Sequence, residues 1–352
     1  MKESFSQGQD ALLETVINKG LCVTCGACVD LCPYFTYVDG RVIVMDRCRA
    51  GEGSCFRWCP QAPWKTGTPD TRGREEREGI GPFIAVFAAR SRDPEKRASA
   101  QNGGVVTALM KLALECGVVE SVIVTGRGDG GSPMGERIDS SGRISAVSGS
   151  RYTASAALAA LNRAEKEGVQ RIGVIGVPCQ MAALERRGRY LAEKGLKDPV
   201  LLRIGLFCTW ALDYRRLSAY LTQKGLKGPL KKADIPPPPA EVFRVSTAAG
   251  AFEYPLPEVR ALIQKGCSVC RDMTALHGDI SVGAFEGREG WNTVIIRTES
   301  GKALFDQAVE KGKVESEPFP EENLHGLNRA ALGKKKRGAE AYRQMIGEEN
   351  GE

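Results

Sequence analysis

The fold of the N-terminal part of this chain is decided by the stretch Cys22-Val23-Thr24-Cys25-Gly26-Ala27-Cys28-Val29-Asp30-Leu31-Cys32-Pro33. Its spacing, C-x2-C-x2-C-x3-C-P, is typical of loops that bind iron-sulfur clusters. A tight loop turns such cysteines toward one centre, and Gly26 and Ala27 let backbone N–H groups approach the sulfurs. A zinc knuckle is the competing interpretation, but four cysteines in eleven positions followed by proline favour iron and sulfide.

A second group, Cys48-x6-Cys55-x3-Cys59-Pro60, departs from that spacing because Glu52 stands at the middle position and the first cysteine is displaced. In two-cluster proteins the fourth cysteine of each run ligates the other cluster. One 4Fe-4S cluster is therefore assigned to Cys22, Cys25, Cys28 and Cys59, and a second centre to Cys32, Cys48 and Cys55. Three cysteines indicate a 3Fe-4S cluster, or a 4Fe-4S cluster whose fourth iron is held by Glu52, Ser54 or water. A lost second cluster is the remaining alternative.

The composition indicates a globular protein of two or three domains, since the 352 residues are 42% hydrophobic. Twelve cysteines behind a start, Met1–Ser4, without an apolar signal segment predict reduced cytoplasmic thiols. No apolar run approaches the roughly 18 residues that span a bilayer, so we expect contact with membranes only through partner subunits. The net charge of +6 is interspersed, and the short basic run Lys334–Arg337 is typical of a solvated helix face, so no nucleic-acid partner is expected.

The pattern along the chain predicts a small iron-sulfur domain over residues 1–62, a linker over 63–82, a large domain over 83–345 and a tail over 346–352. The linker is rich in Pro, Gly, Thr and charge. In the large domain apolar runs alternate with helical patterns, which is typical of an α/β fold. Strands are expected at 83–87, 122–125, 172–176, 200–207, 279–285 and 292–298, and helices at 1–20, 104–115, 154–167, 213–224, 301–312 and near the C-terminus. Residues 236–239, four prolines, predict an extended loop.

Four more cysteines lie in the large domain. Cys179 and Cys208 each follow a predicted strand, and in an open α/β sheet such strand ends gather on one edge, where ligands bind. The pair Cys267-x2-Cys270 could complete a four-thiolate site there. Spacing alone also allows a zinc or redox pair. Cys116, near the end of an apolar helix, is expected in the core.

Several motifs in this order resemble the family of beta subunits of coenzyme F420 hydrogenases and dehydrogenases, over roughly residues 82–345. They are Ser99-Ala100-Gln101-Asn102-Gly103-Gly104-Val105-Val106-Thr107, Gly149-Ser150-Arg151-Tyr152-Thr153, Val177-Pro178-Cys179-Gln180, Gly205-Leu206-Phe207-Cys208, Gly266-Cys267-Ser268-Val269-Cys270, Gly278-Asp279-Ile280-Ser281-Val282-Gly283 and Gly290-Trp291-Asn292-Thr293-Val294. The fused N-terminal domain resembles the arrangement in the F(420)H(2) dehydrogenase input subunit. The expected architecture is therefore α/β (α+β), with a small ferredoxin-like iron-sulfur domain before a larger α/β flavin-binding domain.

The resemblance implies a non-covalent FAD and a 4Fe-4S cluster on Cys179, Cys208, Cys267 and Cys270. It also implies that the Gly-Gly turn at a helix start cradles flavin phosphate, where free N–H groups favour anions. The flavin contacts implied are Gly103, Gly104, Thr107, Tyr152, Thr153 and Gln180. No catalytic side chain is assigned, because the cofactors perform the chemistry.

The function implied is electron transfer between reduced coenzyme F420, which passes hydride to FAD, and a partner redox complex, through 4Fe-4S clusters. Expected partners are other subunits of a hydrogenase, formate dehydrogenase, heterodisulfide-reductase-like or quinone-linked complex. The alternative is an adaptor with FAD and iron-sulfur clusters that does not use coenzyme F420, because residues 236–239 replace the glycine-containing loop of family members with deazaflavin activity. A structural zinc protein is the third interpretation.

Overall fold

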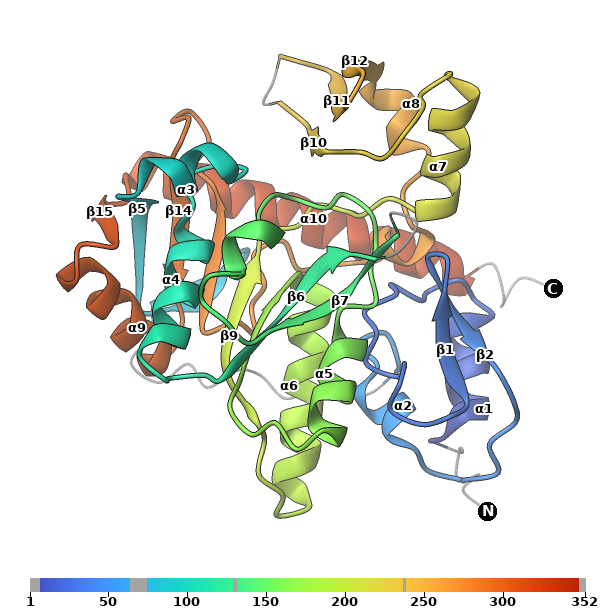
Figure 1. Cartoon of the computed structure of the whole chain (residues 1–352). Helices are drawn as coiled ribbons and strands as arrows, with labels where there is room; N and C mark the ends of the chain where they lie inside the picture. Colours follow the sequence, from blue (N-terminus) through green and yellow to red (C-terminus); the bar gives the residue numbers. More distant parts are fainter. Residues whose placement is uncertain (1–6, 64–74, 129–131, 237–238, 348–352) are drawn as a thin grey trace.

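The computed structural model describes residues 7–63, 75–128, 132–236 and 239–347 (Figure 1). The large domain is built on an eight-stranded sheet in the order β15-β5-β14-β13-β9-β8-β6-β7. The strands are β5 (Ala85–Ser91), β6 (Ser121–Arg127), β7 (Pro133–Ile138), β8 (Ile172–Gly176), β9 (Val200–Leu206), β13 (Ile280–Ala284), β14 (Asn292–Ile296) and β15 (Val314–Pro318). The pairings make β5, β6, β8, β9 and β13 parallel to one another, so their carboxyl ends share one edge of the sheet.

Helices cover both faces of this sheet, as its buried apolar strands require. They are α3 (Pro94–Ser99), α4 (Val105–Glu115), η3 (Ile144–Val147), α5 (Leu158–Lys166), α6 (Pro178–Glu193) and α9 (Glu299–Glu310). One core cluster joins Leu109 and Met110 of α4 to Phe305 of α9. Another joins Leu161 of α5 to Leu184 of α6. The two clusters give the large domain a layered core on either side of the sheet.

A smaller unit lies beyond the carboxyl edge of the sheet, at the top of Figure 1. It holds α7 (Tyr214–Gln223), α8 (Leu256–Arg260) and an antiparallel sheet of β10 (Lys232–Asp234), β11 (Val242–Thr247) and β12 (Gly250–Pro255). Leu217, Phe243 and Tyr254 form its own core. The loop expected over the four prolines falls partly outside the described residues, at 237–238.

The N-terminal domain is small and loop-rich, and the C-terminal helix covers it. It contains α1 (Gln9–Leu12), η1 (Leu13–Ile17), the hairpin of β1 (Phe35–Val38) and β2 (Arg41–Val44), and α2 (Ser54–Trp58). The helix α10 (Glu321–Gly347) runs to this domain (Figure 1). Its Tyr342 and Met345 pack against the core of the domain. A short hairpin of β3 (Glu75–Arg77) and β4 (Gly81–Phe83), and the turn η4 (Lys265–Cys267), complete the described elements.

The expected elements of the large domain are present with shifted ends, and three expectations need correction. The helix expected over residues 1–20 is the short pair α1 and η1, and α6 is a helix that the apolar pattern did not indicate. Cys116 is exposed rather than in the core, because it caps α4 where Gly117 (φ +65°) turns the chain outward. Lys334 is buried although its three basic neighbours are exposed, because only this residue of the run faces inward. No helix in the described ranges is long and apolar enough to cross a bilayer.

Candidate electron-transfer site

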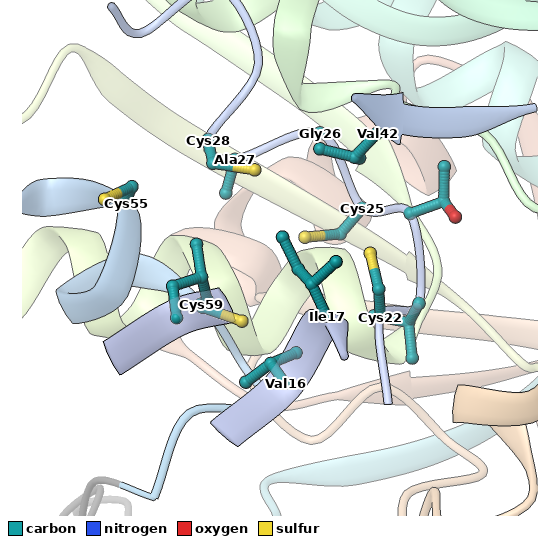
Figure 2. Close-up of a pocket in the computed structure, with 13 residues that line it drawn as sticks. Val16, Ile17, Cys22, Cys25, Gly26, Ala27, Cys28, Val42, Cys55 and Cys59 are labelled. Carbon is teal, nitrogen blue, oxygen red and sulfur yellow. The ribbon is translucent and has the colours of Figure 1, made fainter. Parts of the chain in front are cut away.

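The first cysteine group lines one hollow in the N-terminal domain. Left-handed backbone at Thr24 (φ +57°), Gly26 (φ +88°) and Asp30 (φ +57°) curls the ligand loop. The sulfurs of Cys22, Cys25 and Cys59 turn toward a common space in Figure 2, with Cys28 above it. The apolar walls are Leu12, Val16, Ile17, Val23, Ala27 and Val42, and Cys55 lies to one side. The sulfurs therefore face one another inside an apolar enclosure.

The thiols of this hollow interact with one another electrostatically. Burial raises the pKa of Cys25, and the nearby Cys59 and Cys22 raise it further. Burial likewise raises the pKa of Cys59 to about 11. All twelve cysteines are free of disulfides. Buried thiols in this state hold their protons unless a cation replaces them, which is the situation that iron binding relieves.

The donors around this hollow bear on which metal they suit. Four thiols, Cys22, Cys25, Cys28 and Cys59, line one enclosure whose other walls are mainly apolar. Iron-sulfur clusters are held by cysteine thiolates of this kind. The residues present therefore fit an iron-sulfur cluster.

The second group lies beside the first. Burial raises the pKa of Cys55 to about 11, and its thiol neighbours are Cys32 and Cys48. The Cys48 loop is held by the buried Gln9, whose Oε1 accepts the Cys48 N–H at 2.7 Å and whose Nε2 donates to the Asp46 carbonyl at 2.9 Å. Cys28 also interacts with Cys55, so the two groups adjoin.

The residues expected to complete the second centre are both nearby. Ser54 opens the helix α2 that carries Cys55. Glu52 is largely exposed, and its Oε1 lies 3.9 Å from Nη2 of Arg57. The carboxylate of Glu52 is therefore paired with a guanidinium of the helix that carries Cys55.

The third group forms at the carboxyl edge of the main sheet. Cys179 stands in the first turn of α6, just after β8, and Cys208 follows the adjacent β9. Burial raises the pKa of Cys179, whose thiol neighbours include Cys267, Cys270 and Cys208. Burial also raises the pKa of Cys208 to about 12 and that of Cys267 to about 11. The structure thus brings together four cysteines that span 92 positions of the sequence.

A buried lysine adjoins this third group. Lys334, which is 4% exposed, donates from Nζ to the carbonyl oxygens of Cys208 at 2.6 Å and Asp272 at 2.7 Å. It belongs to α10, far along the chain. Its position ties the C-terminal helix to the cysteine group.

The third group adjoins the first. A Cβ at Gly266, beside Cys267, would lie 2.8 Å from the carbonyl oxygen of Cys22, so the two cysteine loops pack closely. Hydrogen bonds fix the two domains together at this point. Asn162, which is buried, donates from Nδ2 to the carbonyls of Val29 at 2.7 Å and Ala27 at 3.1 Å. Gln264 donates to the Cys22 carbonyl at 3.0 Å.

The large domain is similar to a known protein family. Residues 169–322 match a model of the C-terminal part of the coenzyme F420 hydrogenase/dehydrogenase beta subunit, and residues 86–162 match that of its N-terminal part. The coenzyme F420 hydrogenase beta subunit of Methanothermobacter thermautotrophicus is 32% identical over 247 residues, which are 69% of this chain and 87% of the relative. This chain belongs to the family of coenzyme F420 hydrogenase/dehydrogenase beta subunits. It is therefore an oxidoreductase of the electron-transfer subunit type.

Other similarities cover the N-terminal domain as well. Residues 15–36 match a 4Fe-4S binding domain model. The F subunit of the F(420)H(2) dehydrogenase of Methanosarcina mazei is 26% identical over 339 residues, which are 95% of this chain and 94% of that relative. A chain of the F420-reducing [NiFe] hydrogenase complex of Methanosarcina barkeri matches with a TM-score of 0.66 at 32% identity, over 75% of this chain and 93% of that one. The family fold is thus joined here to an iron-sulfur domain.

The residues that the family resemblance implies for FAD gather at the carboxyl edge of the sheet. Gly104 (φ +75°) caps α4 without a side-chain hydrogen bond to its first turn. A Cβ at Gly103 would lie 2.7 Å from Oδ1 of Asn292, so the backbone at Gly103 passes close to the Asn292 side chain. Thr107 Oγ1 lies 3.2 Å from Ser148 Oγ, which brings the Gly149–Thr153 motif to the same helix start.

The remaining implied contacts are held in place by the chain itself. Thr153 bridges to Leu212. Burial raises the pKa of Tyr152 to about 12, and the neighbouring Asp234 carboxylate raises it further. Gln180 is buried with both ends of its amide used, since Oε1 accepts the Val177 N–H at 2.9 Å and Nε2 donates to the Ser155 carbonyl at 3.2 Å.

Two polar groups that the motifs contained but that were not singled out lie at this edge. Nε of Arg151 and Oε1 of Gln101 are buried without a hydrogen-bond partner in the described part of the chain. Burial and the nearby Arg127 lower the pKa of Arg151. Arg151 stands inside the Gly149–Thr153 motif, which could have signalled it.

Proposed function

We propose that this chain exchanges electrons between reduced coenzyme F420 and a partner redox complex, using FAD at the sheet edge and three iron-sulfur centres. When bound, FAD converts a two-electron hydride transfer into single electrons, and the clusters carry those electrons one at a time. The proposal extends the family membership to this chain's own substrate and partner. The relatives include a chain of an F420-reducing [NiFe] hydrogenase complex, which supports a partner of that kind.

The chain's own residues would hold these groups as follows. The start of α4, after Gly104, and the orphaned Nε of Arg151 suit the diphosphate of FAD, because both offer N–H donors and positive potential. Gln180 and Thr153 would hold the walls of the site, through the contacts described above. The cysteine groups would hold, in order from the flavin, four, four and three ligands.

A single observation supports this proposal: eleven thiols form three groups, and each group adjoins the next. Gly266, beside Cys267, packs against the backbone of Cys22, and Cys55 lines the same enclosure as Cys28. Buried relay centres that adjoin one another conduct electrons, whereas structural metal sites need no such series. Because the third group lies at the same sheet edge as Arg151 and Gly104, the series begins where the flavin is expected.

The test is an anaerobic assay of the protein with its iron and FAD fully loaded. We expect reduced coenzyme F420 to be oxidised with a viologen dye as acceptor, or the reverse reaction with reduced viologen to bleach the F420 absorbance. Full FAD and iron occupancy without turnover in either direction would refute coenzyme F420 as the substrate and leave the adaptor. A colourless protein without iron would refute the electron-transfer proposal as a whole.

A further inference from the structure

Arg186 lies on the helix that joins two of the cysteine groups. The helix α6 carries Cys179 in its first turn, and Arg186 follows seven residues later, two turns along the same face. Cys179 belongs to the third cysteine group, at the sheet edge. Arg186 reaches from the same helix to the N-terminal domain, where the first group lies.

The contacts of Arg186 bracket Cys59. Its side chain donates from Nε to the carbonyl of Arg57 at 2.9 Å and from Nη1 to the carbonyl of Ala62 at 3.0 Å. Arg186 is 5% exposed. Its third nitrogen, Nη2, is buried without a hydrogen-bond partner in the described ranges. One donor of a buried guanidinium is therefore left for a group that the chain itself does not supply.

The charges around Arg186 indicate which kind of group would accept a hydrogen bond from its Nη2. The charged or titratable groups that act on it are the thiols of Cys59 and Cys25 and the guanidinium of Arg57. No carboxylate among the described residues pairs with it. Its neighbour Arg187, by contrast, forms ion pairs with Glu165 and Asp198, although its Nε has no hydrogen-bond partner in the described part of the chain. A buried charge without a counter-ion is strongly unfavourable, so Arg186 requires an anion beside Cys59.

We propose that Arg186 is the counter-ion of the cluster held by Cys22, Cys25, Cys28 and Cys59, and that its positive charge raises the reduction potential of that cluster. The proposal rests on the cluster assignment of the proposed function. A cubane with four thiolate ligands carries net negative charge, and each added electron makes it more negative. A fixed positive charge and an N–H donor near the sulfurs therefore favour the reduced form. The middle centre of the series then accepts electrons from the flavin-side cluster more readily.

The test is a potential titration of loaded protein, poised with dithionite and mediator dyes and followed by EPR. At a fixed potential we expect Arg186→Gln to lower the ratio of reduced to oxidised middle cluster about tenfold, which is a shift of about −59 mV for one electron. Arg186→Lys keeps the charge and should leave the ratio near that of the unaltered protein. Lys194→Gln is the matched control, because it removes one positive charge from the exposed end of the same helix.

The outcomes separate this proposal from the proposed function. Unaltered protein without 4Fe-4S signals would refute the cluster assignment itself. Signals that are present but have the same potential in Arg186→Gln would refute only the role of Arg186. If Arg186→Gln loses the cluster and Arg186→Lys keeps it, the charge is required, which supports the proposal. If both variants lose the cluster, Arg186 acts only by its hydrogen bonds to the carbonyls of Arg57 and Ala62, and the proposal is wrong.

Discussion

The contact between Gly26 and Ala156 yields a prediction about how the two domains are held together. Gly26 lies in the ligand loop with φ +88°. A Cβ there would lie 2.6 Å from the carbonyl carbon of Ala156 and 2.7 Å from its oxygen. Gly168 has nearly the same backbone angle, φ +84°, but a Cβ there would meet nothing within 4 Å. The two glycines therefore separate backbone strain from a steric clash between domains.

The magnitudes differ accordingly. Alanine in left-handed backbone costs about 1 kcal/mol at either position. At Gly26 carbon contacts need about 3.5 Å, so the ligand loop and Ala156 must separate by roughly 0.9 Å. Because both atoms belong to the backbone, no rotamer change relieves the overlap, and overpacking adds about 1–3 kcal/mol. We expect the free energy of unfolding to fall by about 2–4 kcal/mol in Gly26→Ala and by about 1 kcal/mol in Gly168→Ala.

Two measurements check this prediction on protein loaded anaerobically. The melting temperature should fall by roughly 2 °C for each kcal/mol lost from the free energy of unfolding. It should therefore fall further in Gly26→Ala than in Gly168→Ala. Amide hydrogen exchange should speed up at Leu158, whose N–H donates to the Cys25 carbonyl at 3.1 Å, in Gly26→Ala only. Equal thermal shifts in the two variants, or unchanged exchange at Leu158, would refute the idea that this contact seats the ligand loop.

Three further predictions concern buried polar groups. Asn162→Ala strips the Val29 and Ala27 carbonyls of their donor and should lower the free energy of unfolding by about 1–3 kcal/mol, seen as a lower melting temperature, whereas an unchanged melting temperature would show that water replaces the amide. Lys334→Met leaves the Cys208 carbonyl without a donor and removes the ammonium from the Asp272 carbonyl, and it should destabilise the protein by about 2 kcal/mol in a denaturant titration, whereas the exposed Lys336→Met should not. Burial lowers the pKa of His277, so the unfolded chain binds its proton more readily, and stability should decline as pH falls below about 6.5. In His277→Gln the melting temperature should change less between pH 8 and pH 5.5 than in the unaltered protein. An equal change in both proteins would show that other groups cause the loss of stability.

Local spacing made the N-terminal cysteine run readable from sequence, because its four ligands stand on one short loop. The order of strands made the edge position of Cys179 and Cys208 readable too, since parallel strands place their carboxyl ends together. The contact between that sheet edge and the cysteine loop of the N-terminal domain could not be predicted from the sequence. It depends on Asn162 and Gln264, whose amides bond to carbonyls more than a hundred residues away and follow no spacing rule.

Burial of single charges was the second feature beyond the reach of sequence. Lys334 stands in a run of four basic residues, and the run as a whole is typical of a solvated helix face. Which one of the four turns inward depends on where α10 crosses the cysteine group. Arg186 was hidden for a related reason, since α6 was not among the expected helices, so no face of it could be assigned to the interior.

The position of α6 makes the path of electrons under the proposed function independent of domain motion. This one helix carries Cys179 of the flavin-side group, and its Arg186 holds the carbonyls of Arg57 and Ala62 on either side of Cys59 in the middle group. The amides of Asn162 in α5 and of Gln264 also hold the ligand loop to the large domain. Hinged domains would make the rate of transfer depend on closure, whereas a shared helix fixes the separation of the centres once the chain has folded. Under the proposed function, we therefore expect the charges beside each centre, rather than movement between domains, to control electron flow.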